Sequence, residues 1–276
     1  MKRHHPLPNL TALVPDDLWT LICPLFPPQS PRPKGGRPLL DDRSTLAGIV
    51  YVLTTGIQWR FLPTQLGFGS PSTCRRRLHT WQAEGIWQKI HTALLNHLAS
   101  HDKLDWSRCS VDSASIAAPL GGTETGPNPT DRGKLGTKRH LLVDGNGVPL
   151  AVLLSAANVH DSRMLEAVVD AVSPVKNGRP GRPRFRPDKL HADKAYDMRR
   201  CRYALCLRGV VPRIARRGVE SSTSLGTVRW RVERTLAWLV RFRRLQTRYE
   251  RRADLHLAFT FLACALLCYR RVTGRF

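Results

Sequence analysis

The sequence predicts a mixed α/β protein with a mainly helical N-terminal region, and two observations support this fold class. Apolar residues recur at helical spacing before Trp106 and alternate as in strands after it. Beyond that point the expected order is strand, β-hairpin, helix, strand, helix, strand and long helix, which is typical of a layered α/β domain. We therefore expect a helical region over 1–105 and a mixed-sheet domain over 106–276.

The first elements are helical. A short helix is expected within 16–26, and an arm rich in Pro, Gly and basic residues over 27–38. A second helix begins at Asp41 or Asp42, either of which can cap it, and ends at Gly56.

The next helix carries a run of arginines. Ser70 is its expected N-cap, with Pro at the first helical position, and Gly85 terminates it. Its arginines are Arg75, Arg76 and Arg77. Helices joined by short Gly-containing turns, with arginines on the last, predict a helix-turn-helix-like DNA-binding region. A plain helical subdomain with a solvated basic face also fits this pattern.

The second half contains the strands. A strand over 107–118 carries Asp112, and the next two strands form a hairpin around the turn 144–147. A helix is expected over 162–172, and another strand ends at Asp193. The remaining elements are a helix that ends at Gly209, a short strand at 210–215, a helix over 227–244 and a buried C-terminal helix over 255–269, which is too short for a comfortable membrane span.

The charge balance indicates a polyanionic partner. The chain of 276 residues has 44 Lys and Arg against 21 Asp and Glu, a formal net charge of +23. Nucleic acid is the simplest partner for such a surplus, although a ribosomal or merely basic soluble protein shares it. The seven cysteines lack the spacing of a zinc site, and the N-terminus lacks an apolar signal-peptide core. We therefore expect a cytoplasmic, nucleoid-associated protein with reduced thiols.

Three acids have local contexts that would let them converge. Asp112 lies in the first strand, Asp193 at the end of a later one, and Glu233 beside the apolar stripe of the long helix. A carboxylate cluster in a basic protein suits Mg²⁺, which prefers hard oxygen ligands and can clamp the oxygens of a phosphodiester under attack. A capped turn at Asp193 and a surface ion pair of Glu233 with Arg229 or Arg234 are the structural alternatives.

Several stretches carry a resemblance to a known family. They are "SVDSASI", "GTKRHLLVD", "NVHDSRML", "LHADKAYD" and "RWRVERTLAWLVRFRRLQTRYER", preceded by "GGRPLLDDRSTLAGIVYVLTTGIQWRFLP" and "PSTCRRRLHTWQAEGIW". In this order and over nearly the full length, the chain resembles the DDE transposases of bacterial insertion sequences, especially those of insertion sequence 5 and its relatives. The resemblance implies an RNase H-like mixed-sheet catalytic core behind a mainly α-helical N-terminal DNA-binding region.

The resemblance also assigns roles. Asp112, Asp193 and Glu233 match the three metal-binding catalytic acids, with Mg²⁺ as cofactor, Mn²⁺ as its substitute and two ions per site. Arg229 matches the arginine of the family's Y-x2-R-x3-E-x6-K signature. Gly226 and Val240 replace its Tyr and Lys, which puts the grip on DNA ends in doubt. The implied partners are double-stranded DNA, at the inverted-repeat ends and at the target, and a second copy of the chain, as a homodimer or higher assembly, with no membrane.

Further basic residues are candidate phosphate contacts. Arg241, Arg243 and Arg244 belong to an arginine-rich segment over 241–252, and Lys138 lies on the hairpin, where a solvated strand face is an equal alternative. Asp161 is expected to cap a helix, and Trp230 and Trp238 are expected to pack in the core rather than stack on bases.

The sequence predicts a transposase that cuts and rejoins DNA. A catalytically inactive inverted-repeat-binding protein and a structure-specific nuclease are the alternatives.

Overall fold

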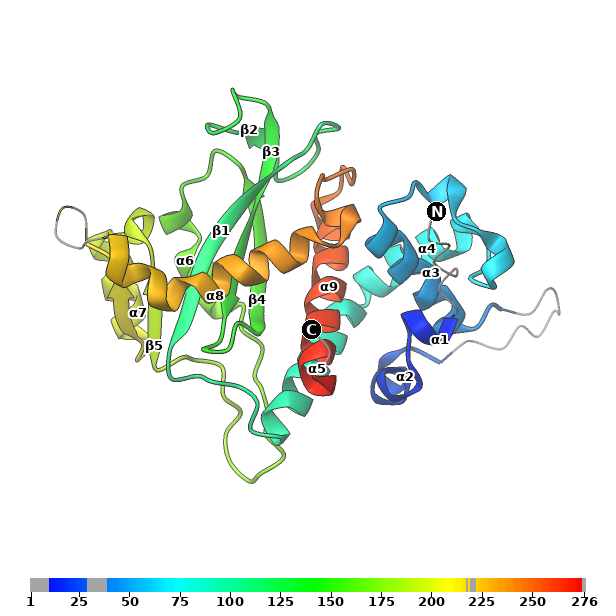
Figure 1. Cartoon of the computed structure of the whole chain (residues 1–276), viewed down its shortest axis with the longest axis horizontal. Helices are drawn as coiled ribbons and strands as arrows, with labels where there is room; N and C mark the ends of the chain where they lie inside the picture. The colour runs from blue at the N-terminus through cyan, green and yellow to red at the C-terminus, as the bar shows by residue number, and fades with distance from the viewer. Residues whose placement is uncertain (1–9, 29–38, 217, 219–221, 275–276) are drawn as a thin grey trace, which may run out of the picture.

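The computed structural model describes residues 10–28, 39–216, 218 and 222–274. For residues 222–228 it describes the backbone but not the side chains. Nearly all of the arm expected over 27–38 therefore lies outside the described residues. The elements expected from the sequence appear in the expected order (Figure 1), and the helices α1 (Leu10–Leu13) and α5 (Ile86–Ser100) and the strand β2 (Gly126–Pro127) are additional to them.

The N-terminal region is helical, as predicted. Its α-helices are α1 (Leu10–Leu13), α2 (Asp16–Ile22), α3 (Asp42–Thr55), α4 (Pro71–Ala83) and α5 (Ile86–Ser100). The Asp41 carboxylate accepts the Ser44 N–H at 2.8 Å, and Gly56 ends α3 with a φ of 71°. Ser70 Oγ likewise accepts the Thr73 N–H at 3.1 Å. The predicted caps of α3 and α4 are thus confirmed.

The connections between these helices differ from a simple helix-turn-helix. Residues 56–70 join α3 to α4 and contain the 3₁₀ turns η2 (Trp59–Phe61) and η3 (Thr64–Leu66), a longer connection than the three to four residues of that motif. The tight Gly85 turn instead joins α4 to α5, so the arginine-bearing helix is the first of the closely linked pair.

The sheet has a mixed topology. Its strands are β1 (Cys109–Ala117), β2 (Gly126–Pro127), β3 (Leu135–Val143), β4 (Pro149–Ala156), β5 (Lys189–Ala192) and β6 (Val211–Ile214). The order β4-β3-β1-β5-β6 combines antiparallel pairing of β4, β3 and β1 with parallel pairing of β1, β5 and β6, and β2 adds a short pairing to β3. This arrangement is that of an RNase H-like core, as the resemblance implied.

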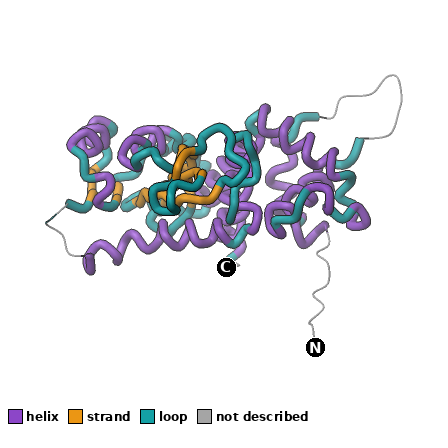
Figure 2. Tube along the Cα trace, turned by 90° about the horizontal axis from the view of Figure 1, so that it is seen from above, coloured by secondary structure: helices purple, strands orange, loops and turns teal. Residues whose placement is uncertain are grey.

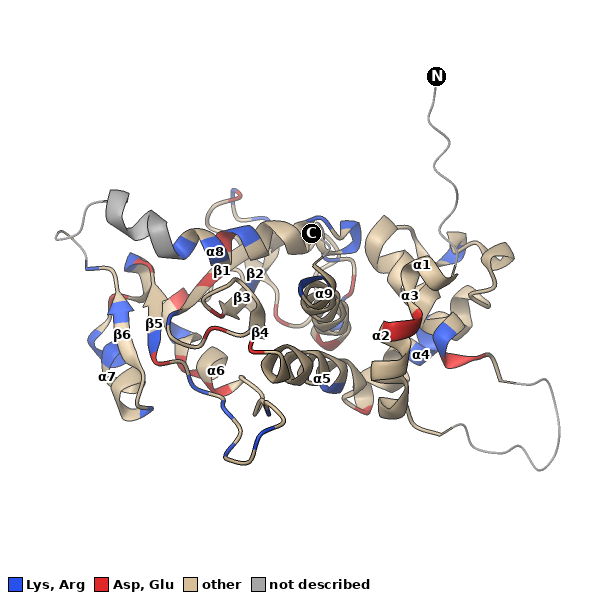
Figure 3. Ribbon diagram, turned by 60° about the horizontal axis from the view of Figure 1, so that its bottom comes forward, with Lys and Arg blue, Asp and Glu red and all other residues tan. Residues whose placement is uncertain are grey.

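Helices cover both faces of this sheet. The long helix α8 (Ser222–Val240) crosses one face over β1 and β3, and α6 (Leu165–Asp170) packs on the other face (Figure 3). The helix α7 (Arg199–Leu207) packs beside β6. Two helices differ from expectation, since α6 is shorter than the predicted 162–172 and α8 ends before Arg241.

The C-terminal helix α9 (Ala253–Thr273) lies between the sheet and the N-terminal helices (Figure 1), and it packs along α5 and against β4. Seen from above, the strands gather towards one end of the molecule and helices and loops make up the other end (Figure 2). Among the described residues, α9 is long and apolar enough to cross a membrane, but 72% of its most apolar window is buried inside the protein. The prediction of a buried C-terminal helix is therefore confirmed.

Candidate active site

Asp112 and Asp193 lie on neighbouring strands. The parallel register of β1 and β5 pairs Ser110 with His191, so the two acids, each two residues further along, come at the same level. Burial raises the pKa of Asp112 to about 6, and the negative charge of Asp193 also raises it. Asp193 directly follows β5, and its Oδ1 accepts the Ala195 N–H at 2.9 Å. The turn that Asp193 caps thus fixes its position beside Asp112.

Glu233 approaches this pair from α8, but its carboxylate is held by an arginine. Arg229 Nη2 lies 3.4 Å from Asp112 Oδ2 and 3.5 Å from Glu233 Oε1, so one guanidinium lies between two of the three predicted metal ligands. No group of three His, Cys, Asp or Glu side chains that could hold a metal ion forms in the part of the chain that the structure describes. The structure brings Asp112 and Asp193 together and pairs Glu233 with Arg229.

The donor set fits a divalent metal ion. Asp112 and Asp193 offer carboxylate oxygens, the ligands that Mg²⁺ prefers. The Tyr196 hydroxyl is buried among the described residues without a hydrogen-bond partner, and negative charges of Asp161, Asp112 and Asp193 act on it. A buried hydroxyl without a partner is costly unless a ligand or water satisfies it. Asp112 and Asp193 would hold the ion, and Glu233 could join them once its carboxylate leaves Arg229.

A second acid-centred cluster adjoins Asp112, and the sequence did not reveal it. Asp161 Oδ1 accepts hydrogen bonds from Ser113 Oγ at 2.8 Å and from Lys138 Nζ at 3.0 Å. The predicted helix cap at Asp161 is wrong, because the His160 side chain takes that role and accepts the Ser162 N–H at 3.3 Å. The motif "NVHDSRML" was the available signal, but the partners of Asp161 are remote in sequence.

Comparison with known proteins places the chain in a family. Residues 105–268 match the family described as "Transposase DDE domain", and residues 14–91 match "Putative transposase of IS4/5 family". The chain belongs to the DDE transposases. Such domains use divalent metal ions, generally Mg²⁺ or Mn²⁺. The narrower assignment to relatives of insertion sequence 5 stays a prediction, because the matched family includes transposases of both the IS4 and the IS5 type.

Curated and solved relatives were also found. The "Putative transposase for insertion sequence element IS402" of Burkholderia cepacia is 50% identical over 162 residues, 59% of this chain and 74% of that protein. The "Insertion element IS402 uncharacterized 16.2 kDa protein" of the same organism is 47% identical over 119 residues, 42% of this chain and 81% of that protein. A crystal structure of the Mos1 strand transfer complex is 13% identical, covers 89% of this chain and 81% of that chain, and has a TM-score of 0.27.

These matches show a DNA transposase, an enzyme of the metal-dependent DDE type, and do not favour the inactive binding protein. We assign the RNase H-like fold of this transposase from its sheet topology and its family match. A TM-score of 0.27 is too low to support the assignment.

The predicted DNA-contacting arginines of α4 fall into two groups. Arg75 and Arg76 are exposed, whereas Arg77 is mostly buried and pairs with Asp42 at 3.1 Å. Arg75 and Arg76 border a hollow of about 530 Å³, whose other lining residues are Trp59, Arg60, Pro71, Ser72 and His79. Arg77 therefore stabilises the helical region, and its neighbours remain candidate phosphate contacts.

The arginine-rich segment 241–252 is also mixed. Arg241 and Arg243 are exposed, but Arg244 is buried and its Nη2 lies 2.7 Å from Glu250 Oε1. The prediction of a phosphate contact at Arg244 is wrong, since a buried paired guanidinium cannot reach DNA. Arg248 is buried as well and donates hydrogen bonds to backbone carbonyls and to Thr137 Oγ1. Arg248 joins β3 to the chain that leads into α9, whereas Arg244 joins that chain to the Ile57 carbonyl after α3.

Lys138 and the tryptophans of α8 also differ from expectation. Lys138 is neither on a solvated strand face nor free, because it pairs with Asp161 at 3.0 Å. Trp230 is 45% exposed, so core packing is wrong for this residue, whereas Trp238 packs against the core. Val240, at the Lys position of the family signature, is exposed, and Gly226 lies in the part of α8 whose side chains are not described.

Proposed function

We propose that this transposase binds the terminal inverted repeats of its element and cuts and rejoins the DNA there by Mg²⁺-dependent phosphoryl transfer. The observation that carries the proposal is the placement of Asp112 and Asp193 at one level of two parallel strands in a member of the DDE family. The negative pair would be self-repelling in a partly buried position unless a cation joined it.

We assign the three acids as ligands of two metal ions, with Mn²⁺ able to replace Mg²⁺. When bound, such ions lower the pKa of the attacking water or 3′-hydroxyl and stabilise the leaving 3′-oxygen. Asp112 and Asp193 hold them from the sheet, and Glu233 completes the site from α8. Arg229 neutralises Asp112 and Glu233 until then, and Asp161 orients Ser113 next to Asp112.

The DNA follows the basic surface in this proposal. Arg229, Arg241 and Arg243 lie in or just after the helix that carries Glu233, and they would contact phosphates near the reacting strand. Arg75 and Arg76 would contact DNA from the helical region, so that residues 1–105 recognise the ends and residues 106–276 cut them. Lys138 is paired with Asp161, so it holds that carboxylate beside Ser113 rather than contacting a phosphate directly.

Two ends must be joined in one complex, and we infer a homodimer or a larger assembly on DNA. Members of the family are in general soluble cytoplasmic proteins. An association with the nucleoid follows from the net charge of +23.

The test compares wild type with Asp193→Asn on a labelled duplex that carries the element's own end, in Mg²⁺ and in Mn²⁺. Asparagine keeps an oxygen that can accept the Ala195 N–H, so the turn after β5 should survive while the charge is lost. Asp188→Asn is the matched control, because Asp188 is an exposed acid five residues earlier.

We expect Asp193→Asn to bind the duplex normally and Mn²⁺ more weakly, and neither to cut nor to join the DNA. Asp188→Asn should cut and join the DNA as wild type does. Cutting by Asp193→Asn at the wild-type rate would remove Asp193 from the site. Wild type that cuts but never joins would instead support the nuclease.

A further inference from the structure

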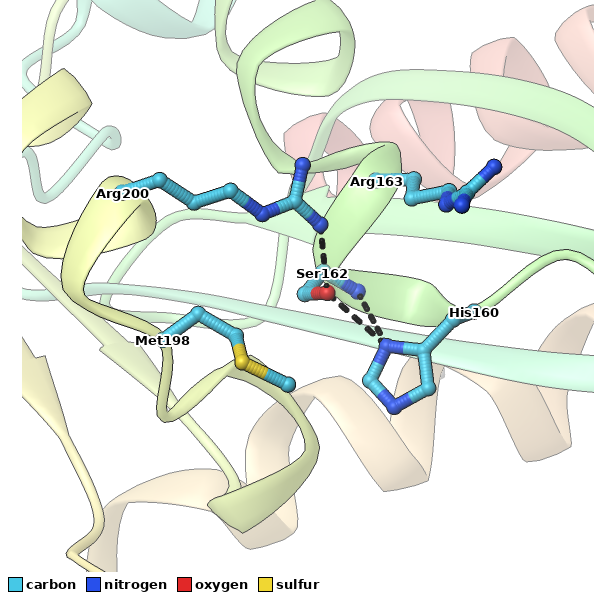
Figure 4. Close-up of a pocket in the computed structure, with 5 residues that line it drawn as sticks. All are labelled: His160, Ser162, Arg163, Met198 and Arg200. Carbon is cyan, nitrogen blue, oxygen red and sulfur yellow. Dashed lines mark hydrogen bonds between the residues drawn. The ribbon is translucent and has the colours of Figure 1, made fainter.

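A pocket of about 680 Å³ opens beside the two short 3₁₀ turns that flank the acids, η4 (Asp161–Arg163) and η5 (Lys194–Tyr196). Figure 4 shows its lining, which consists of His160, Ser162, Arg163, Met198 and Arg200. None of these residues was among the sequence-predicted site residues, and the proposed function does not use them.

Short covalent and hydrogen-bonded links connect this pocket to the candidate active site. Asp161, between two lining residues, accepts the Ser113 hydroxyl at 2.8 Å, and Ser113 directly follows Asp112. On the other side, Met198 follows Asp193 by five residues through η5. The pocket therefore lies near the end of β5 that Asp193 follows. Because Asp112 and Ser113 are successive residues of β1, it is reached from the face of the sheet opposite the one that Asp112 presents to α8.

The polar groups of the pocket are held in place by one another. Arg200 Nη2 donates to Ser162 Oγ at 2.8 Å, and Ser162 Oγ lies 2.8 Å from His160 Nδ1 (Figure 4). Since Ser162 Oγ accepts from Arg200, its own proton is free to go to His160 Nδ1, which also accepts the Ser162 N–H. The proton of a neutral His160 ring is thereby placed on Nε2, which turns that nitrogen into a donor.

The charge of the pocket is positive and not compensated by acids. Arg163 and Arg200 are exposed, and neither forms an ion pair within residues 10–28, 39–216 and 222–274. By contrast, the nearby Arg202 and Arg208 are each paired with an acid at 2.7 Å. Two unneutralised guanidiniums beside an imidazole donor are suited to an anion with several acceptor oxygens, such as a phosphate.

We propose that this pocket binds one phosphate of a DNA strand, adjacent to the phosphate that reacts at Asp112 and Asp193. Arg163 and Arg200 bind its oxygens, His160 Nε2 donates a further hydrogen bond, and the thioether of Met198 packs against the attached sugar or base. The inference rests on the proposed function, since it takes the neighbouring acids as the place where the strand reacts.

The test uses three charge-removing variants, Arg163→Gln, Arg200→Gln and the double variant, with Arg199→Gln as the matched control. Arg199 is an exposed arginine on α7, the helix that also carries Arg200, and Arg199 does not line the pocket. Arg163→Gln should fold normally, because no hydrogen bond of the Arg163 side chain is found among the described residues. A loss of phosphate binding in this variant could therefore not be caused by misfolding. The probe is thymidine 3′,5′-bisphosphate, titrated calorimetrically without metal, followed by duplex DNA binding over a range of salt concentrations.

We expect the double variant to bind the probe about tenfold or more weakly than wild type, because charge-assisted hydrogen bonds are lost. The slope of log affinity for duplex DNA against log salt concentration should fall by about one, while Arg199→Gln behaves as wild type. Equal probe affinity and equal slope for the double variant and Arg199→Gln would overturn the pocket proposal. If wild type at the same time cuts and joins its DNA end, the proposed function survives that failure; if wild type never cuts, the proposed function fails separately.

Discussion

Replacement of Arg229 by methionine should strengthen metal binding while it weakens the reaction. The Arg229 guanidinium lies within about 3.5 Å of both Asp112 and Glu233, where any metal ion that uses these carboxylates must compete with it. Methionine keeps much of the side-chain length and removes the charge. The two carboxylates then repel one another with no internal cation, which favours an added one.

The size of the effect follows from the geometry. A unit charge 3.4 Å from a carboxylate interacts by about 5 kcal/mol at an effective dielectric constant of about 20. Solvent reduces this value strongly, because the Glu233 side chain is 59% exposed, although Asp112 is only 18% exposed. The net gain in the free energy of metal binding is then about 1–2 kcal/mol, which corresponds to about 5- to 30-fold tighter binding.

The measurement is Mn²⁺ binding without DNA, by calorimetry or by the electron paramagnetic resonance of free Mn²⁺. Arg241→Met is the control, because Arg241 is exposed just after the same helix and no acid pairs with it among the described residues. Cleavage of the labelled DNA end should fall in Arg229→Met, since phosphate neutralisation is lost with the charge. Mn²⁺ binding that weakens in Arg229→Met would refute the reasoning.

Two further changes test the electrostatics. Glu250→Ala should destabilise the protein by about 3–5 kcal/mol in urea unfolding, because it leaves the buried Arg244 without its acidic partner. Asp254→Ala breaks an exposed pair with Arg252 and should lower the stability much less. Equal losses of stability in the two variants would contradict the burial argument. Burial raises the pKa of Asp112 to about 6, and a metal ion needs the deprotonated carboxylate, so Mn²⁺ affinity should fall as pH drops through about 6. Affinity that stays constant down to pH 5 would show that Asp112 is not a ligand.

Local signals predicted much of the fold. Helix caps and helix ends depend on residues that are close together in the sequence, and so they can be predicted from it. This applies to the caps at Asp41 and Ser70 and to the helix ends at Gly56 and Gly85. The alternation of apolar residues likewise places strands well. The strand contexts of Asp112 and Asp193 and the family resemblance led us to expect that the two acids converge, but the register that brings them to the same height comes from the pairing of β1 with β5.

Side-chain partners that are distant in sequence could not be predicted. Arg241 and Arg244 look alike in the sequence, yet only tertiary packing decides that Arg244 is buried beside Glu250. Asp161 was misjudged as a cap because Ser113, its main partner, is 48 residues away. For Glu233, the ion pair with Arg229 that the sequence offered as the structural alternative is present, and its role as a metal ligand stays a prediction.

The position of α9 has a consequence for how the chain is made. Residues 253–273 lie between the helical region and the sheet and pack against α5 and β4, so they complete two halves that were translated much earlier. Both halves must leave the ribosome with apolar surface still uncovered, and they become joined only when α9 follows. Nascent chains arrested before residue 253 should therefore be captured by chaperones or proteases, and DNA-cutting activity should arise in a single late step of synthesis.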